Sequence, residues 1–249
     1  MVYRLEDTNP YALTVPIDLY EFLYYRTFDN DAWKPLYVPF AMDAYELYKN
    51  YGIEVARLND THMYDYDFDG RIDELSLEFI RMTEGVVQAN RPYMMRTRGS
   101  KKFEYGSKRV ALQPARETTI ECSTIDQKIS ITGTYKGLTN GELFYNNYYA
   151  MNSQGGLQRA KSPDATLAPQ RWYLKIENKD GSPMKDDEYF AAQIRVLGAS
   201  DDEEVTGISD METQSAETES ATYRLDGQRV TNIQQPGLYV SRGQRIMVK

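Results

Sequence analysis

The chain has 249 residues, of which 41% are hydrophobic and 27% charged, and its formal net charge at neutral pH is −8. This length suits one large domain, or one domain with a small appendage. The negative charge argues against nucleic acid or anionic lipid as the partner, because both require a cationic protein face.

No apolar run approaches the ~20 residues that a membrane-spanning helix needs. The first residues carry no basic segment followed by an apolar one, as a signal peptide would. We therefore expect either a cytosolic protein or an exported one whose signal segment is not part of this sequence. The single cysteine excludes an internal disulfide framework, and the 21 tyrosines favour strands.

Most of the chain alternates apolar and polar residues between closely spaced turn signals. Strands are predicted at residues 18–28, 34–40, 53–60 and 76–82, and again after a turn at 89–92. One short helix is predicted at 41–52, with Met42, Tyr45 and Tyr48 along one side and Gly52 as its end. Further strands are predicted within residues 109–116, 118–125, 128–137, 141–153, 155–161, 169–181 and 187–198. This spacing predicts an all-β fold, an antiparallel β-sandwich spanning residues 1–200.

After residue 199 the composition becomes acidic and rich in serine and threonine, which predicts a flexible linker at 201–220. Strand character returns at 221–249, with turns expected at Asp226-Gly227 and Arg242-Gly243. We expect this last segment to form a small three-stranded β module.

An acidic loop follows the strand at 53–60. Asp65, Asp67 and Asp69, the Arg71 carbonyl and Asp73 stand at the spacing of the first ligands of a calcium-binding loop. This pattern predicts one structural Ca²⁺.

The same stretch also fits a simple β-hairpin with a two-residue turn at Asp69-Gly70. Ser76 stands where a calcium loop normally has a bidentate glutamate, and the segment before the loop is strand-like. In this second hypothesis the aspartates are solvated and keep the hairpin edge from pairing with another strand. Both hypotheses stay open from sequence.

Motifs that carry catalysis are scarce. The sequence has no Gly-x-Ser-x-Gly elbow, phosphate-binding loop or dinucleotide fingerprint, and its one histidine, His62, lies far from its one cysteine, Cys122. A carboxylate pair for glycoside hydrolysis stays open, because only spatial separation decides it. We predict that the protein is not an enzyme.

Binding is the stronger expectation. Tyr145, Tyr148 and Tyr149 lie among asparagines, a composition typical of adaptable recognition surfaces, so they are the predicted ligand-binding residues. The alternative is that Tyr145 and Tyr149 pack inward around a turn at Asn146-Asn147. The basic stretch at 91–102 is either a solvated strand and loop or a site for acidic polysaccharide.

Several segments together carry a family resemblance. They are WKPLYVPF (33–40), ANRPYMMR (89–96), ITGTYKG (131–137), APQRWYLKI (168–176) and, in the tail, YRLDGQRV and GLYVSRGQRIMVK. In this order they resemble the β-rich surface domain of secreted Bacteroidetes proteins, as in the C-terminal regions of leucine-rich-repeat and adhesin-like proteins. The tail is similar to a short sorting or anchoring module. The resemblance implies export, a β-sandwich and association with the cell envelope, and it implies no defined reaction.

The sequence thus predicts a non-catalytic secreted or cell-surface module that serves adhesion or structural spacing. Its expected partner is a host protein, matrix component or glycan, at the extracellular or outer-membrane surface. The alternative is a carbohydrate-binding module of a surface glycan-uptake system, and a glycan-active hydrolase is a more distant third.

Overall fold

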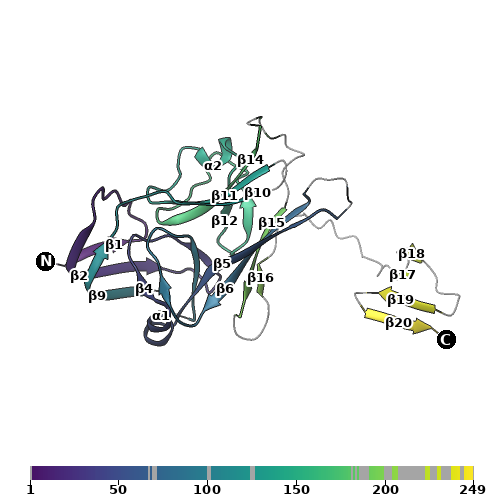
Figure 1. The fold of residues 1–249 in the computed structure, drawn as a ribbon, viewed down its shortest axis with the longest axis horizontal. Helices are drawn as coiled ribbons and strands as arrows, with labels where there is room; N and C mark the ends of the chain where they lie inside the picture. The colour runs from purple at the N-terminus through teal and green to yellow at the C-terminus, as the bar shows by residue number, and fades with distance from the viewer. Residues whose placement is uncertain are drawn as a thin grey trace. The chain divides into compact units, whose positions relative to one another are not determined.

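The structure is a computed structural model of the chain (Figure 1). It describes residues 2–66, 68, 72–99, 102–123, 127–180, 182, 184 and 191–198, and the strand residues 204–206, 222–224, 229–230, 237–241 and 244–248. The chain divides into two compact units, Met1–Ser209 and Asp210–Lys249.

Three sheets form most of the described part of the first unit (Figure 1). The three-stranded sheet has the order β1 (Tyr3–Glu6), β2 (Ile17–Thr27), β9 (Lys102–Leu112). The five-stranded sheet has the order β10 (Thr119–Ser123), β11 (Gln127–Thr134), β14 (Arg171–Asn178), β12 (Tyr149–Met151), β13 (Leu157–Arg159). The six-stranded sheet has the order β16 (Glu204–Thr206), β15 (Ala191–Leu197), β6 (Glu74–Met82), β5 (Ile53–Tyr64), β8 (Tyr93–Thr97), β3 (Lys34–Leu36).

Short elements complete the described part of this unit. A two-stranded ribbon pairs β4 (Met42–Asp43) with β7 (Val86–Val87), and the helices are α1 (Ala44–Tyr51) and α2 (Glu142–Tyr145). The prediction of an all-β fold is confirmed. The pairing is mostly antiparallel, but β1 runs parallel to β2 and β15 runs parallel to β6.

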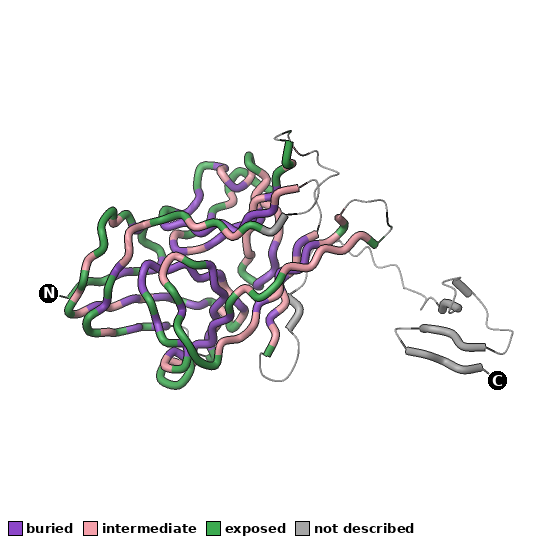
Figure 2. The backbone as a smooth tube through the Cα atoms, viewed as in Figure 1, coloured by how far each residue is buried: buried purple, intermediate pink, exposed green. Residues whose placement is uncertain are grey.

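The six-stranded sheet is buried on both faces where β5 and β8 pair. Val55 and Met95 contribute to one hydrophobic cluster, together with residues of the three-stranded sheet such as Phe22. The next residues along the pleat, Ala56 and Met94, contribute to a second cluster with residues of the five-stranded sheet. Figure 2 shows the buried residues concentrated in this interior. Consecutive buried residues at 53–56 follow directly from this two-sided burial.

Tyr37 lies directly on the backbone of the five-stranded sheet. A Cβ built on Gly133 of β11 would lie 2.1 Å from Cε2 of the Tyr37 ring, so only glycine admits this contact. The Tyr37 hydroxyl donates to the Arg116 carbonyl and accepts a bond from the Thr118 amide at 2.9 Å. The ring therefore holds the segment before β10 against β11.

Helix α1 ends at Gly52 as the sequence predicts, but it begins at Ala44 rather than at residue 41. Asp43 caps its start by accepting a hydrogen bond from the Glu46 amide at 2.8 Å. Gly52 ends it with a φ of 65°, and its amide donates to the Tyr48 carbonyl at 3.1 Å. The cap at Asp43 explains why the helix begins later than residue 41.

Helix α2 stands where the sequence predicts a strand. Its first turn is closed by the Glu142 carboxylate, which accepts from the Thr139 amide at 2.9 Å, and by the Tyr145 amide, which donates to the Gly141 carbonyl at 2.8 Å. These local bonds outweigh the strand preference of the tyrosine-rich segment, and strand pairing resumes only at β12.

The C-terminal unit contains a four-stranded sheet rather than the predicted three-stranded one. Its order is β18 (Arg229–Val230), β17 (Thr222–Arg224), β19 (Gly237–Ser241), β20 (Gln244–Val248). The additional strand arises because the segment after the predicted first turn pairs back onto β17, with Thr222 opposite Val230. The turn residues Asp226-Gly227 and Arg242-Gly243 lie outside the described residues.

The predicted linker differs from the structure at one place. Residues Glu204–Thr206 form β16 and pair with β15, with Ile194 opposite Thr206. The rest of 201–220 lies outside the described residues, so the linker itself stays a prediction. Neither helix within the described ranges combines the length and apolar character that crossing a bilayer requires.

The Tyr37–Gly133 contact yields a stability prediction. Replacing Gly133 by alanine forces the Tyr37 ring away from β11, and we expect a loss of roughly 1–3 kcal/mol in the free energy of unfolding. The measurement is urea denaturation followed by circular dichroism. Gly106→Ala on β9 is the matched control, because its added Cβ would lie 3.2 Å from Cδ2 of Leu23, a side chain end that can shift. Equal losses in the two variants would contradict the prediction.

Candidate functional site

The three predicted ligand-binding tyrosines do not share one surface. Tyr145 is 71% exposed at the end of α2, whereas Tyr149 on β12 is 3% exposed and belongs to the core cluster between the sheets. Tyr148 is half-buried, and its ring packs on that of Tyr173 with 4.8 Å between centroids. Tyr148 and Tyr149 point to opposite faces because they are adjacent along an extended chain. The alternative is right for Tyr149 and for the turn at Asn146-Asn147, and wrong for Tyr145.

The acidic loop closes the hairpin of β5 and β6. The last strand pair is Tyr64 opposite Glu74, and the Asp73 amide donates to the Tyr64 carbonyl at 2.8 Å. One Asp73 carboxylate oxygen accepts from the Tyr66 amide at 2.6 Å. The hairpin is thus confirmed.

The predicted calcium ligands are only partly described. Asp65 and Asp73 are described, while Asp67, Asp69 and Arg71 lie outside the described residues, as does the predicted turn at Asp69-Gly70. Within the described part of the chain, no three His, Cys, Asp or Glu side chains are grouped so that they could hold a metal ion. The five-ligand calcium site stays a prediction.

Exposed aromatic side chains gather at the end of this hairpin. Tyr64, Tyr66 and Phe68 form what we call the aromatic arm. The rings of Tyr64 and Tyr66 are parallel within 3°, with 5.7 Å between their centroids. Tyr66 is 61% and Phe68 89% exposed. Large apolar groups this exposed, grouped together, are typical of interaction sites.

The end of the aromatic arm is exposed because β5 extends beyond the two sheets that cover its first residues. The first four residues of β5 are buried and its last four are half-buried. In Figure 1 the end of β5 extends beyond the packed sheets. Partial desolvation and the nearby Glu74 carboxylate raise the pKa of Tyr66, so its hydroxyl stays a hydrogen-bond donor at neutral pH.

His62 lies near a serine and two carboxylates, which are the residue types of a catalytic triad, but the serine is not positioned to react. It stands opposite Ser76 in the strand register, and its Nε2 lies 3.4 Å from a Glu78 carboxylate oxygen and 3.9 Å from one of Asp60. The Ser76 side chain is fully buried, and its Oγ has no hydrogen-bond partner within the described part of the chain. A serine without access to solvent or to the imidazole is not positioned to act as a nucleophile.

Two arginines of the basic stretch at 91–102 form ion pairs within the fold. The Glu54 carboxylate is buried on β5 and contacts Arg96 Nε at 2.6 Å, Arg98 Nη2 at 2.8 Å and Arg81 Nη2 at 3.0 Å. Arg81 and Arg98 also lie over the Tyr48 ring. Arg96 and Arg98 therefore hold a buried carboxylate rather than forming a solvated loop.

A second candidate site is a pocket of about 220 Å³, which we call the arginine pocket. It lies where β2, β3, the β12–β13 turn and the start of β14 meet. Its charged lining residues are Arg26, Asp29, Lys34 and Arg171. A positive lining is unexpected in a chain whose net charge is −8.

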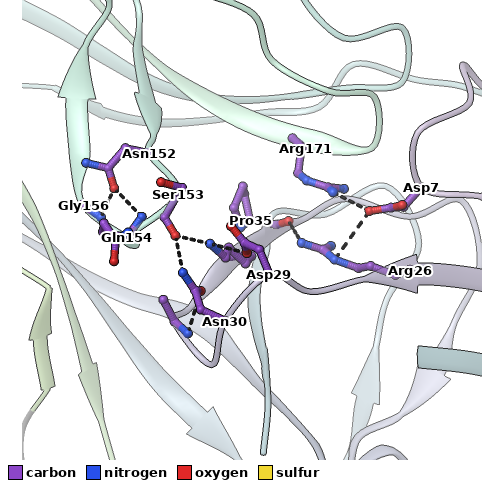
Figure 3. Close-up of polar contacts among 12 residues, drawn as sticks. Asp7, Arg26, Asp29, Asn30, Pro35, Asn152, Ser153, Gln154, Gly156 and Arg171 are labelled. Atoms are coloured by element: carbon purple, nitrogen blue, oxygen red, sulfur yellow. Dashed lines mark hydrogen bonds and ion pairs between the residues drawn. The ribbon is translucent and has the colours of Figure 1, made fainter. Parts of the chain in front are cut away.

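One buried carboxylate holds both arginines (Figure 3). An Asp7 oxygen lies 3.7 Å from Arg26 Nε and is bonded by Arg171 Nη2, and Arg26 Nη2 donates to the Pro35 carbonyl at 3.0 Å. Burial lowers the pKa of Arg26 to about 10, and the positive charge of Arg171 adds to this effect. Arg26 is therefore still protonated at neutral pH.

The opposite wall of the pocket is held by Lys34. Its Nζ lies 3.1 Å from Asp29 Oδ1 and donates to the Ser153 carbonyl, which also accepts from Asn30 Nδ2 at 2.8 Å. Burial alone would raise the pKa of Asp29, but the bond from Lys34 and backbone bonds bring it below its usual value. Figure 3 shows Asn152 folding the adjacent turn through bonds to the Gln154 and Gly156 amides.

Sequence reasoning missed this pocket because its charged residues are far apart along the chain. One signal was available at Arg26, which continues the inward-facing series Phe22, Tyr24 and Phe28. A positively charged side chain that faces the core, as its apolar neighbours on the strand do, needs a hydrogen-bonding or charged partner inside the protein. Comparisons of the chain with protein-family models, curated proteins and solved structures give no match.

The shared carboxylate yields a second stability prediction. Asp7→Asn leaves Arg26 and Arg171 buried without a counter-charge, and we expect the free energy of unfolding to fall by about 3 kcal/mol. Urea denaturation at neutral pH measures this. Asp29→Asn is the control, because that carboxylate is largely exposed and its ion pair contributes at most ~1 kcal/mol. A loss at Asp7 no larger than that at Asp29 would refute the assignment.

Proposed function

We propose that the chain is a non-catalytic recognition module of a secreted or cell-surface protein, and that it binds carbohydrate through the aromatic arm. The observation that carries the proposal is the stacked pair of Tyr64 and Tyr66 rings, of which Tyr64 is half-buried and Tyr66 is 61% exposed. The cell-envelope location rests on the resemblance of the sequence to Bacteroidetes surface domains.

The chemistry of the arm suits a sugar ligand. A tyrosine ring offers an apolar face to the C–H groups of a pyranose, and its hydroxyl offers a hydrogen-bonding group to the sugar hydroxyls. Tyrosine also loses little conformational entropy when it is ordered on binding. Because the Tyr64 and Tyr66 rings stack on each other, Tyr64 supports Tyr66 from one side and leaves the other face of Tyr66 for a sugar.

The non-catalytic part of the proposal is supported by where the reactive groups lie. Ser76 is fully buried with no hydrogen bond to His62 among the described residues, and the buried carboxylates Asp7 and Glu54 are held by arginines. A glycosidase instead needs two carboxyl groups facing each other across a substrate cleft.

Adhesion to a host or matrix protein is a second function for the same arm. Phe68 is 89% exposed at its end, and an apolar ring of this exposure is suited to a pocket on a protein partner. Structural spacing needs no binding surface, and it predicts that replacing arm residues has no effect on any interaction.

The experiment is binding of labelled protein to a panel of glycans and matrix proteins. We expect selective glycan binding that weakens roughly two- to tenfold in Tyr66→Ala, because a stacked ring contributes about 0.5–1.5 kcal/mol. Tyr20→Ala is the control, since Tyr20 is similarly exposed (67%) but lies on β2. Binding confined to matrix proteins would favour adhesion. Absence of all binding would leave the spacer hypothesis.

The same panel separates the two hypotheses for the acidic loop. If a calcium ion organises it, EDTA lowers glycan binding, and Asp67→Asn has the same effect in the presence of calcium. If the loop is a plain charged hairpin, binding is equal in both buffers. The control is Asp18→Asn on β2, which should not change the calcium response.

A further inference from the structure

We propose that the arginine pocket binds the carboxylate of an acidic monosaccharide, a hexuronic acid, as a second recognition site separate from the aromatic arm. The inference stands on the geometry of the pocket, and it holds whether or not the arm binds sugars.

The Arg26 guanidinium at the base of the pocket is incompletely hydrogen-bonded. The Arg26 side chain is 1% exposed, and within the described part of the chain its Nε and Nη1 meet no acceptor of hydrogen-bonding geometry. The Tyr24 hydroxyl lies beside the Arg26 guanidinium. A hydrogen bond to that hydroxyl would still leave some of the five N–H donors of the guanidinium without an acceptor. Buried donors without acceptors are costly, and both nitrogens are closed to solvent, so a ligand gains their hydrogen bonds only when the Arg26 side chain turns toward the pocket, whereas an anion there balances its charge directly.

The arginine pocket carries an excess of positive charge. Arg26, Lys34 and Arg171 are balanced by only two carboxylates, Asp7 and Asp29, which leaves one positive charge at the pocket. This excess matches a monoanion such as a carboxylate better than a phosphate dianion. A guanidinium also binds a carboxylate through two parallel hydrogen bonds. The overall charge of −8 further disfavours a highly charged ligand.

The neutral residues that line the pocket combine polar and apolar groups. Thr27, Asn152 and Thr166 offer hydroxyl and amide groups, while Met151 and Leu167 offer apolar surface. This mixture suits a sugar ring, whose hydroxyls and C–H faces need both kinds of contact. A volume of about 220 Å³ is smaller than the ~300–1,000 Å³ of pockets for drug-sized ligands, so it suits a single sugar unit.

The frame of the pocket is held in place before any ligand binds. Gln170, next to Arg171, is fully buried with a φ of 59°, a left-handed conformation that is costly for a residue other than glycine. Its side chain donates to the Glu6 and Asn9 carbonyls at 2.7 and 3.1 Å, and its carbonyl accepts from the Tyr37 amide at 3.1 Å. These bonds fix the direction from which Arg171 enters the pocket.

The test is titration of the full chain with galacturonate and glucuronate, followed by nuclear magnetic resonance, with galactose and glucose as neutral controls. We expect the uronates to bind at least tenfold more tightly than the neutral sugars, and acetate to compete at higher concentration. Lys34→Gln at the pocket wall should weaken uronate binding several-fold. Arg26→Lys keeps the charge but loses the planar pair of donors, and it should weaken binding by tenfold or more.

One further variant keeps the outcome decisive. The resonance shifts that uronates cause at Lys34 and Arg171 should persist in Tyr66→Ala, so failure of this pocket and failure of the aromatic arm can be told apart. If Arg26→Lys does not fold, Lys34→Gln and the comparison of charged with neutral sugars still decide. The proposal is overturned if uronates bind no better than neutral sugars, if Lys34→Gln has no effect, or if inorganic sulfate binds more tightly than acetate.

Discussion

The burial of Trp172 between two sheets is the contact on which the first unit depends. Its side chain on β14 is fully buried, its ring lies nearly parallel to that of Phe79 on β6 with 5.8 Å between centroids, and its Nε1 donates to the Tyr93 carbonyl at 2.7 Å. One side chain thus joins the five-stranded sheet to the six-stranded sheet by packing and by a hydrogen bond. Because neighbouring residues of a strand face opposite ways, the same placement turns Arg171 away from the core and toward Asp7. The arginine pocket is a consequence of this packing.

The six-stranded sheet lies between the other two, and this position explains how β5 contributes both to the core and to the proposed binding surface. Where β5 is covered on both faces, its residues are buried without interruption, and where the covering layers end its side chains become accessible. Tyr64 is the last residue of β5, so one ring of the aromatic arm is held on a strand, while Tyr66 stacks on it from the loop that follows. Recognition residues held on regular elements are positioned more accurately than those on loops.

Charged residues form local groups that the net charge of the chain does not reveal. In this acidic chain, arginines are gathered around single buried carboxylates, Arg26 and Arg171 around Asp7, and three others around Glu54. Each group buries more positive than negative charge, which is tolerated only because the guanidiniums also have carbonyl or aromatic partners. Around Glu54 the arginines lie over the Tyr48 and Trp33 rings. At Asp7 the arrangement opens onto a pocket, and the two groups therefore differ in what they can bind.

The sequence by itself determined the strand-rich character and the end of α1 at Gly52, and it offered the hairpin of β5 and β6 as one of two hypotheses, because alternation, capping and turn chemistry act between near neighbours. It did not determine α2, where two bonds within one turn outweighed the strand preference of the tyrosines. Nor did it determine which face of the sheet Tyr148 and Tyr149 occupy, because that depends on which layer covers β12. Only the tertiary structure brought Arg26, Lys34 and Arg171 to one pocket, since it takes the meeting of three sheets to place them there. Local preferences are encoded in short segments, whereas coverage and the meeting of distant side chains are properties of the packed whole.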